Sequence, residues 1–509
     1  MKKRATILQQ INQALPPRMS YAIRKGLKHK SVSRFKAYAE YHNERFGEMP
    51  AQGKAADVSV TLKSPPVSEL QRFRNFARDC IDKGEPEKLL ASLDEFPAKL
   101  HLHPTFRLDC FVALISLGRL DEANELLRDT LMIGAYNKWA LLRMLGDAYL
   151  FNDKELTRFI VDHIFSAKAF SLLPNEELYV VNTALTYLGE EGCIRHGART
   201  RATPTHDLFF FLSNLRLHRG DFIGQVKHFN HALSLLGMES VSLKDDRGAI
   251  SVTNIESHAD HVQWNGPMVS IAMSTYNSSS TIVPVLESLM SQSYRNLEVL
   301  VVDDCSSDNT VEVASQFSER EPRIRVFQQS QNGGTYRARN RALQEARGEF
   351  FTCNDSDDWA HPAKIEKLVT PLLNSVSSVA SVGGLLRINQ TIGVKPKIRG
   401  YIHEDQSSFC YRREWAIRNV GYYEAVPFGA DSEFSTRVKL AAGEKALKKV
   451  EKPLLFADWS RSSLTGSIRT GITDGGTMAI ARNKYKAAYR ERHESGQLYV
   501  GLEGNTPLL

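Results

Sequence analysis

The sequence predicts two fold classes in one chain: an all-α helical-repeat region, then an α/β domain with a doubly wound, mostly parallel sheet. Two observations carry this prediction. Turn residues recur about every 34 residues between apolar helical stretches in 66–250. From about residue 265, strand-like runs alternate with amphipathic helical stretches instead. The length of 509 residues allows about three domains.

The composition is that of an ordinary globular protein, with 42% apolar and 24% charged residues. It excludes wholesale disorder, collagen-like repeats and a polytopic membrane protein. The six cysteines form no C-x-x-C pair, which argues against a zinc finger, a thioredoxin-like site or a disulfide scaffold and favours a reducing compartment. We find no convincing signal peptide and no apolar run of about 18 residues. The expected location is therefore the cytoplasm.

The positive charge lies in an N-terminal arm, which with its linker spans 1–65. Residues 1–48 contain eleven Lys and Arg against three Glu, a net charge of +8, whereas the rest of the chain carries −1. A basic amphipathic segment can lie on an anionic membrane surface, here the inner face of the cytoplasmic membrane. The alternative is a solvated helical arm packed on its own protein or on a partner. No RNA- or DNA-binding motif is present, so no nucleic-acid partner is expected.

The helical region is predicted to span 66–250. Gly84, Gly118 and Asn152 lie 34 residues apart, Gly220 lies three further periods beyond Gly118, and Gly189 falls near the remaining position. This helix–turn–helix period resembles a tetratricopeptide array, in which neighbouring helix pairs stack into a solenoid. The resemblance implies a surface for a protein partner or for the acceptor. The alternative is a packing and spacer domain.

The second domain is predicted to span 264–470, followed by a partly helical tail over 471–509. The expected strands are 268–273, 297–302, 323–327 and 349–353. The first of the expected helices between them ends near 289. The next two cover about 309–318 and 335–346. This βαβαβαβ succession is typical of a mostly parallel sheet.

Polar clusters follow three of these strands: Ser274–Asn277, Asp303-Asp304 and Asp355–Asp358. Ligands of such sheets bind outside the carboxyl ends of the strands, so we expect these clusters to converge. Any one of them could instead form an Asx turn. Three carboxylates in 355–358 repel one another unless a cation or several donors compensate, and carboxylate oxygens suit Mg²⁺ and Mn²⁺. No Walker A loop and no G-x-G-x-x-G follows a strand, which disfavours a P-loop NTPase and a Rossmann dehydrogenase.

Four segments together resemble the family 2 glycosyltransferases of the GT-A fold. They are Pro267–Asn277, Glu298–Thr310, Asn332–Asn340 (with its Asn-Gly-Gly and Ala-Arg-Asn) and Asp355–Trp359, in the family's order and spacing. The resemblance covers about 264–470 and implies a bacterial polysaccharide-type hexosyltransferase. A Q-x-x-R-W motif is absent, which argues against a processive, membrane-embedded synthase.

The resemblance assigns a set of residues to the nucleotide-sugar donor: Ser274, Tyr276, Asn277, Asp303, Asp304, Arg337, Asp355, Ser356 and Asp357. In this set Tyr276 could stack on the base. Asp304 matches the aspartate that contacts uracil, which implies a UDP-sugar, and Asp303 supports the loop. The Asp355-x-Asp357 pair matches the D-x-D motif. Mn²⁺ or Mg²⁺ is expected on Asp357, with Asp355 as a second ligand or a contact to sugar or ribose.

Three helical arginines, Arg337, Arg339 and Arg341, lie near the donor site in the family pattern. One of them could contact phosphate or sugar, and we choose Arg337 for this role. The alternative is that each of these arginines is a surface residue.

Phe428–Phe434 resembles the family's Glu-Asp catalytic segment. Asp431 matches the general base, although Ala430 replaces the usual preceding glutamate. The alternative for Asp431 is a helix N-cap. Glu433 is a fallback base or an acceptor contact. Trp459 and Arg461 resemble the closing segment near the diphosphate, where no metal-binding histidine is evident.

The resemblance thus implies an inverting, metal-dependent, non-processive transfer from a UDP-sugar to a saccharide or lipid-linked glycan, as in capsule or other cell-surface polysaccharide synthesis. The competing hypothesis is a helical-repeat scaffold or adaptor with a degenerate, inactive transferase domain.

Overall fold

The computed structural model describes residues 67–97, 100–132, 138–148, 206–257, 264–396, 400–459, 463–467, 470–472 and 478–502, and the single positions 157 and 160. The N-terminal arm, Asn152, Gly189 and Arg461 lie outside these residues. The chain divides into two compact units, one of 1–81 with 85–140 and one of 82–84 with 141–509.

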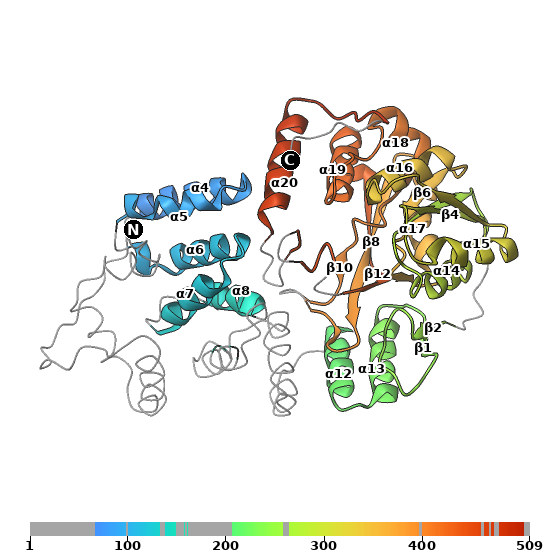
Figure 1. The fold of residues 1–509 in the computed structure, drawn as a ribbon, viewed down its shortest axis with the longest axis horizontal. Coiled ribbons are helices and arrows are strands. Elements are labelled where there is room, and N and C mark those ends of the chain that lie inside the picture. Colours follow the sequence, from blue (N-terminus) through green and yellow to red (C-terminus); the bar gives the residue numbers. More distant parts are fainter. Residues whose placement is uncertain are drawn as a thin grey trace, which may run out of the picture. The chain divides into compact units, whose positions relative to one another are not determined.

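The described residues of the first unit are helical (Figure 1). The helices are α4 (Val67–Asp82), α5 (Pro86–Ala91), α6 (Pro104–Ser116) and α7 (Leu120–Met132), with α8 (Lys138–Ala148) crossing the division between the units. Short 3-10 turns cover Leu93–Glu95 and Leu100–Leu102. In the core, the Phe73 ring stacks on Phe106 at 4.4 Å between centroids. The prediction of helices here is confirmed for the part described.

The periodic glycines share one turn geometry. Gly84, Gly118 and Gly220 have φ of 70°, 69° and 68°, a conformation that costs little only for glycine. After each, the next amide donates to a carbonyl five residues earlier: Glu85 to Cys80 at 2.7 Å, Arg119 to Leu114 at 2.9 Å and Asp221 to Arg216 at 3.0 Å. This is the Schellman helix ending. The 34-residue spacing therefore reports a repeated helix-ending turn at the three positions the structure describes.

The second unit contains a helical hairpin of α12 (His206–His218) and α13 (Phe222–Leu235) that packs on its sheet. The Asn214 side chain accepts a hydrogen bond from the Val394 amide at 2.8 Å and donates to the Val394 carbonyl at 2.7 Å. Phe229 meets Phe456 edge-on at 5.3 Å between centroids. The last hairpin of the 34-residue pattern is thus part of the unit that carries the sheet.

A mixed sheet forms the centre of the second unit. Its main order is β5-β4-β3-β6-β11-β8-β12-β7. The strands are β3 (Val269–Thr275), β4 (Leu297–Asp303), β5 (Ile324–Gln328), β6 (Phe350–Cys353), β7 (Asp358–Ala360), β8 (Ala380–Asn389), β11 (Cys410–Arg412) and β12 (Leu447–Asp458), with β9 (Gly393–Val394) and β10 (His403–Glu404) beside β8. A separate pair is β1 (Ser242–Leu243) and β2 (Ile255–Glu256).

The four predicted strands are confirmed to within two residues, and β3 pairs in parallel with both β4 and β6. The second half differs from a mostly parallel sheet, because β11 runs antiparallel to β6 and β8, and β7 antiparallel to β12.

Helices cover both faces of the sheet (Figure 1). They are α14 (Ile282–Met290), α15 (Thr310–Arg320), α16 (Thr335–Glu345), α17 (Lys364–Leu373), α18 (Arg413–Asn419), α19 (Ala430–Ala442) and α20 (Ile480–Glu494). Side chains of α16, α18, α19 and α20 share one buried apolar cluster with β3, β4, β6 and β8. The expected helix in the C-terminal tail is confirmed as α20.

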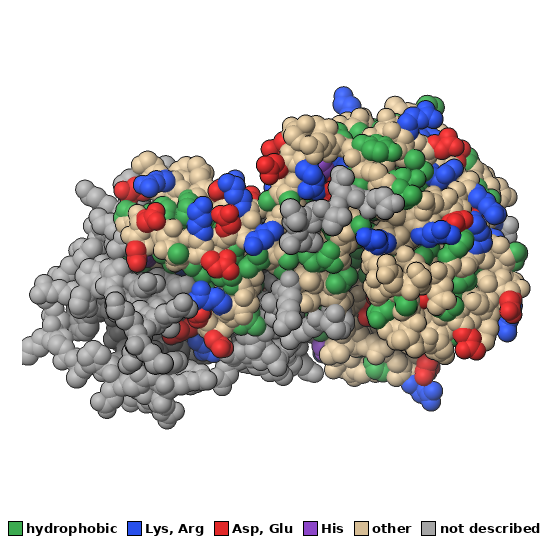
Figure 2. Space-filling view, turned by 45° about the horizontal axis from the view of Figure 1, so that its top comes forward, with side chains coloured by type: hydrophobic (Ala, Val, Ile, Leu, Met, Phe, Trp, Pro, Cys, Tyr) green, Lys and Arg blue, Asp and Glu red, His purple; other side chains and the backbone are tan. Residues whose placement is uncertain are grey.

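Basic and acidic side chains are interspersed on the face of the second unit that Figure 2 shows, so no field of one sign covers it. Within the described part of the chain, every helix is too short or too polar to cross a bilayer.

Candidate active site

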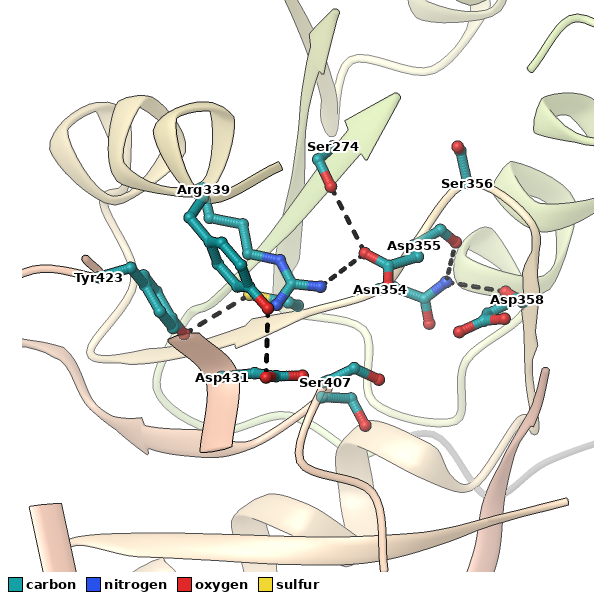
Figure 3. A network of polar contacts seen from close by, with 12 residues as sticks. Ser274, Arg339, Asn354, Asp355, Ser356, Asp358, Ser407, Tyr423 and Asp431 are labelled. Carbon is teal, nitrogen blue, oxygen red and sulfur yellow. Dashed lines mark hydrogen bonds and ion pairs between the residues drawn. The ribbon is translucent and has the colours of Figure 1, made fainter. Parts of the chain in front are cut away.

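The site forms where the strand order reverses. The chain runs from β3 outward to β4 and β5, then returns to place β6 on the other side of β3. The carboxyl ends of β3 and β6 therefore lie side by side, and Ser274 Oγ is 3.4 Å from Asp355 Oδ1. This is the point at which open α/β sheets bind ligands, and Figure 3 shows the polar network found there.

The loops after β3 and β4 are joined by short polar contacts. The Asn277 amide donates to Ser306 Oγ at 2.8 Å, and the Asn277 side chain accepts from the Ser307 amide at 2.9 Å. Ser278 Oγ lies 2.8 Å from Ser356 Oγ, which ties the same loop to the acidic segment. Tyr276 stays 51% exposed. Its ring is thus open to an aromatic ligand, whereas Asn277 and Ser356 hold the loops together.

Asp303 and Asp304 are both buried and both hold loops. Asp303 accepts from the Ser306 amide at 3.0 Å and from Ser306 Oγ at 2.5 Å. Asp304 accepts from Gln329 Nε2 and from the amides of Gly333 and Gly334, each at 2.7 Å. Because both Asp304 oxygens accept protein donors, the carboxylate anchors the loop before α16. Its charge also lies at the positive end of that helix.

Of the three helical arginines, the structure brings Arg339 to the site. Arg339 Nη2 donates to Asp355 Oδ1 at 2.6 Å, and the Arg339 side chain is buried (Figure 3). Burial acts to lower the pKa of Arg339, but the Asp355 charge and the other ionisable neighbours together raise this pKa well above its usual value. Arg337 and Arg341 are exposed, and Arg341 pairs with Glu345. The arginine that contacts the acidic segment is therefore Arg339, whereas the exposed Arg337 stays a predicted donor contact.

Asn354 and Lys364 hold the acidic loop of residues 355–358 in its conformation. Asn354 Nδ2 donates to the carbonyls of Asp355 at 3.0 Å and Asp358 at 2.8 Å. The buried Lys364 ammonium donates to Asn354 Oδ1 at 2.7 Å and to the Cys353 carbonyl at 3.1 Å. Burial lowers the pKa of Lys364. The turn that presents Asp357 is thus held by side chains that sequence reasoning did not single out.

The three carboxylates of 355–358 have three different environments. Asp355 is paired with Arg339, Asp358 is buried, and Asp357 is exposed. Protein atoms crowd one side of Asp357, and this desolvation, with the charges of Asp355 and then Asp458, raises the pKa of Asp357 to about 6. Asp458 is near because β12 pairs with β7, with Ala457 opposite Asp358.

The residues that could hold a divalent cation lie on the exposed side of this loop. Asp357 and Asp458 are both exposed carboxylates that repel each other, and hard oxygen donors of this kind suit Mg²⁺ and Mn²⁺. Asp355 is the weaker candidate ligand, because Arg339 already neutralises it. No preformed cluster of three or more His, Cys, Asp or Glu residues with ligand geometry occurs in the described residues.

Asp431 lies in the first turn of α19, whose N-cap is Gly429. The structure thus does not support the N-cap alternative for Asp431. Asp431 Oδ1 accepts from Tyr336 Oη at 3.2 Å and from the Ser432 amide at 2.8 Å. The side chain is half-buried, and the same close view contains Asp355 and Asp431 (Figure 3). A partly exposed carboxylate with one oxygen held in place suits a general base.

Glu433 is part of the protein interior, with 0% exposure. Arg437 Nη2 donates to Glu433 Oε2 at 2.9 Å, and His493 Nε2 of α20 lies 2.9 Å from Oε1. The neighbouring Glu424 accepts from Tyr485 Oη at 2.8 Å and from Arg492 Nη2 at 2.6 Å. Glu433 is therefore placed to fasten α20 to α19, and this geometry does not favour it as a fallback base or acceptor contact.

We expect Glu433→Gln to lower the free energy of unfolding by about 3 kcal/mol, because it leaves the buried Arg437 charge without its partner. Chemical denaturation measures this loss. The matched control is Glu444→Gln, an exposed residue just beyond α19 that pairs with Lys439, for which little change is expected. A folded Glu433→Gln protein with normal stability and abolished turnover would instead support the base role.

Trp459 follows β12 and packs under Lys395, whose ammonium lies 3.7 Å from the ring centroid. The Trp459 amide donates to the Ile388 carbonyl at 3.0 Å. Trp459 thus lies directly after Asp458, where β12 ends near the acidic loop.

The comparisons with known proteins match the segment that contains the Ser274 loop, Asp304 and the acidic segment. Residues 270–428 match the family model described as glycosyl transferase family 2. Glycosyltransferase GlyG of Streptococcus pneumoniae is 28% identical over 182 residues, 36% of this chain and 57% of GlyG. TuaG of Bacillus subtilis, named for teichuronic acid biosynthesis, is 37% identical over 101 residues, 20% of this chain and 40% of TuaG. A crystal structure of S. aureus TarS 1–349 with UDP-GlcNAc aligns with a TM-score of 0.33 and 24% identity over 38% of this chain and 60% of that one.

The chain spans little more than half of GlyG and less than half of TuaG. The family match ends before Asp431, and it includes the Ser274 loop, Asp304, Arg339 and the acidic segment. Residues 270–428 are therefore a family 2 glycosyltransferase domain.

Proposed function

We propose that the chain is an inverting, metal-dependent glycosyltransferase that moves a sugar from a nucleotide sugar to a hydroxyl of a saccharide or lipid-linked glycan. The carrying observation is that one network contains both halves of the required chemistry. The acidic segment, with Asp355 fixed by Arg339 and Asp357 exposed, provides the donor side. Asp431, with one oxygen held by Tyr336 and Ser432, provides the acceptor side.

In the proposed reaction, Asp431 Oδ2 takes the proton from the acceptor hydroxyl while the oxygen of that hydroxyl attacks the anomeric carbon. The bond from that carbon to the donor diphosphate breaks, and attack from the opposite face inverts the anomeric centre. Asp357, with Asp458 beside it, would hold Mn²⁺ or Mg²⁺. The metal would supply positive charge for the leaving diphosphate. Tyr276 would stack on the nucleotide base.

UDP is proposed as the nucleotide from the resemblance of the Asp303-Asp304 segment to the family. Asp304 serves this site through the Gly333-Gly334 loop that it anchors, rather than through an unoccupied carboxylate. Cell-surface polysaccharide synthesis is proposed because the relative TuaG is named for such a pathway.

The experiment is a donor panel. Purified full-length protein is mixed with Mn²⁺ and UDP-glucose, UDP-galactose, UDP-N-acetylglucosamine or UDP-N-acetylgalactosamine, and UDP release is followed. We expect one sugar to give release that EDTA stops. If the protein neither binds nor turns over any nucleotide sugar, the scaffold hypothesis with an inactive transferase domain takes its place.

We further propose that helices α4 to α7 belong to a tetratricopeptide-like partner surface, and that the basic arm places a cytoplasmic protein on the inner membrane face. The shared Schellman turns support the first proposal, and the charge of residues 1–48 supports the second. Deleting 1–48 should release the protein from anionic liposomes at low salt. Unchanged liposome binding would contradict the membrane role.

A further inference from the structure

The hydroxyl of Tyr336 joins the two halves of the site, because the ring lies beside Arg339 and the hydroxyl contacts Asp431. Tyr336 is the second residue of α16, and Asp304 holds the glycine pair from which this helix starts. Its side chain is buried and its ring stacks on Tyr423, with 6.1 Å between centroids. The Arg339 guanidinium lies 5.5 Å from the centroid of the same ring. Contacts on the donor side of the site thus hold the Tyr336 ring in place, and its hydroxyl extends to Asp431.

The hydrogen-bond directions at this hydroxyl are determined by its neighbours. The Gly429 amide donates to Tyr336 Oη at 2.9 Å. A tyrosine hydroxyl has one proton, so the contact of 3.2 Å to Asp431 Oδ1 is the one that Tyr336 donates. Burial, and then the Asp431 charge, raises the pKa of Tyr336, which keeps this proton on the hydroxyl.

The two donors leave the two oxygens of Asp431 in different states. Tyr336 and the Ser432 amide both donate to Oδ1. No protein donor to Oδ2 is recorded among the described residues, so this oxygen is the one available to an acceptor hydroxyl. The Gly429 backbone packs closely against the Tyr485 ring, since a Cβ at this position would lie 3.3 Å from it. The helix that carries Asp431 and the tyrosine that orients it are therefore packed as one assembly.

We propose that Tyr336 is a positioning residue, which orients Asp431 as the base by donating its hydroxyl proton to Oδ1 and so reserves Oδ2 for the acceptor. This inference rests on the proposed function for its catalytic part, whereas the hydrogen bond itself can be tested without turnover. It also gives α16 a second task, since the helix that supplies Arg339 to Asp355 supplies Tyr336 to Asp431.

The first test is a stability cycle on the full chain, with Tyr336→Phe, Asp431→Ala and the double variant. Tyr336→Phe should lower the Tm of the second unit by about 2–4 °C at pH 7. In the Asp431→Ala background the same change should cost clearly less, because the acceptor of the bond is gone. An equal loss of Tm in both backgrounds would overturn the proposal, whatever the turnover.

The second test is kinetic and uses the UDP-sugar that the panel turns over fastest. Tyr336→Phe should lower kcat about tenfold through lost orientation, with the donor KM nearly unchanged. The control is Tyr423→Phe, which removes a buried hydroxyl 3.8 Å from Cys353 Sγ and should leave kcat nearly unchanged.

The outcomes separate the two proposals. Coupling in the stability cycle with no nucleotide sugar turned over would keep the Tyr336–Asp431 contact and reject the transferase proposal. Turnover that Tyr336→Phe leaves unchanged in kcat would keep the transferase and reject the positioning role.

Discussion

Asp431→Asn is expected to lower kcat by about 10²–10⁴-fold, the range that a positioned general base contributes. The substitution keeps the shape of the side chain, and the amide oxygen can still accept from Tyr336 and from the Ser432 amide. The amide nitrogen cannot take a proton, so the loss falls on the chemical step. Donor binding should persist, because the proposed donor contacts lie on α16 and on the loops after β3 and β6 rather than on α19. Initial rates of UDP release and calorimetric binding of UDP measure the two effects separately.

The matched control is again Glu444→Gln, which removes a carboxylate at the opposite end of α19 and should leave turnover unchanged. Turnover of Asp431→Asn within about threefold of wild type, with intact UDP binding, would exclude Asp431 as the base. Tyr336→Phe would then have nothing to orient.

The first half of the sheet is predictable from sequence because each strand is an apolar run with a polar residue at its end. Both faces of these parallel strands are covered, so every residue of β3 and β4 is buried and most of them are apolar. The acidic segment is different. Asp358–Ala360 becomes β7 only because β12, almost a hundred residues later, pairs with it. No local pattern in 355–360 carries that information, and the approach of Asp458 to Asp357 depends on the same pairing.

Two site assignments could have been sharpened by helical spacing alone. Arg339 lies three residues after Tyr336 and four before Leu343, which places it on the buried face of α16, whereas Arg337 and Arg341 share the exposed face. Glu433 and Arg437 are four residues apart on α19, the spacing of an ion pair. Their complete burial depends on α20, which is distant in sequence and outside the matched family segment.

The Tyr336–Asp431 contact had no sequence signal. The two residues are 95 positions apart, and tyrosine at the start of a helix is as easily a packing residue as a donor. Asp304 shows the converse: the sequence pattern points to a ligand contact, but the folded chain uses both oxygens for its own loop amides. In both cases the role depends on which backbone groups the tertiary fold brings within 3 Å.

Asp357→Ala is expected to remove metal-dependent turnover, because it deletes the exposed carboxylate of the acidic segment. Stabilisation by the metal of the negative charge that develops on the leaving diphosphate is worth several kcal/mol in the transition state. Without it, kcat/KM should fall by about 10²-fold or more. Mn²⁺ binding, followed by the electron paramagnetic resonance of the free ion, should weaken in parallel. Asp458→Asn should weaken both to a smaller degree, since β12 brings the Asp458 charge close to Asp357 and Asp458 would share the proposed cation.

The control for this series is Asp121→Asn, which removes an acidic side chain from the first turn of α7 in the other unit. It should affect neither Mn²⁺ binding nor turnover. EDTA should stop the wild-type and control enzymes, and added Mn²⁺ should restore them but not Asp357→Ala. Wild-type turnover that resists EDTA would contradict the metal role. The repulsion among Asp355, Asp357 and Asp458 would then have to be relieved by Arg339 and Arg387, the basic residues whose charges reach this loop.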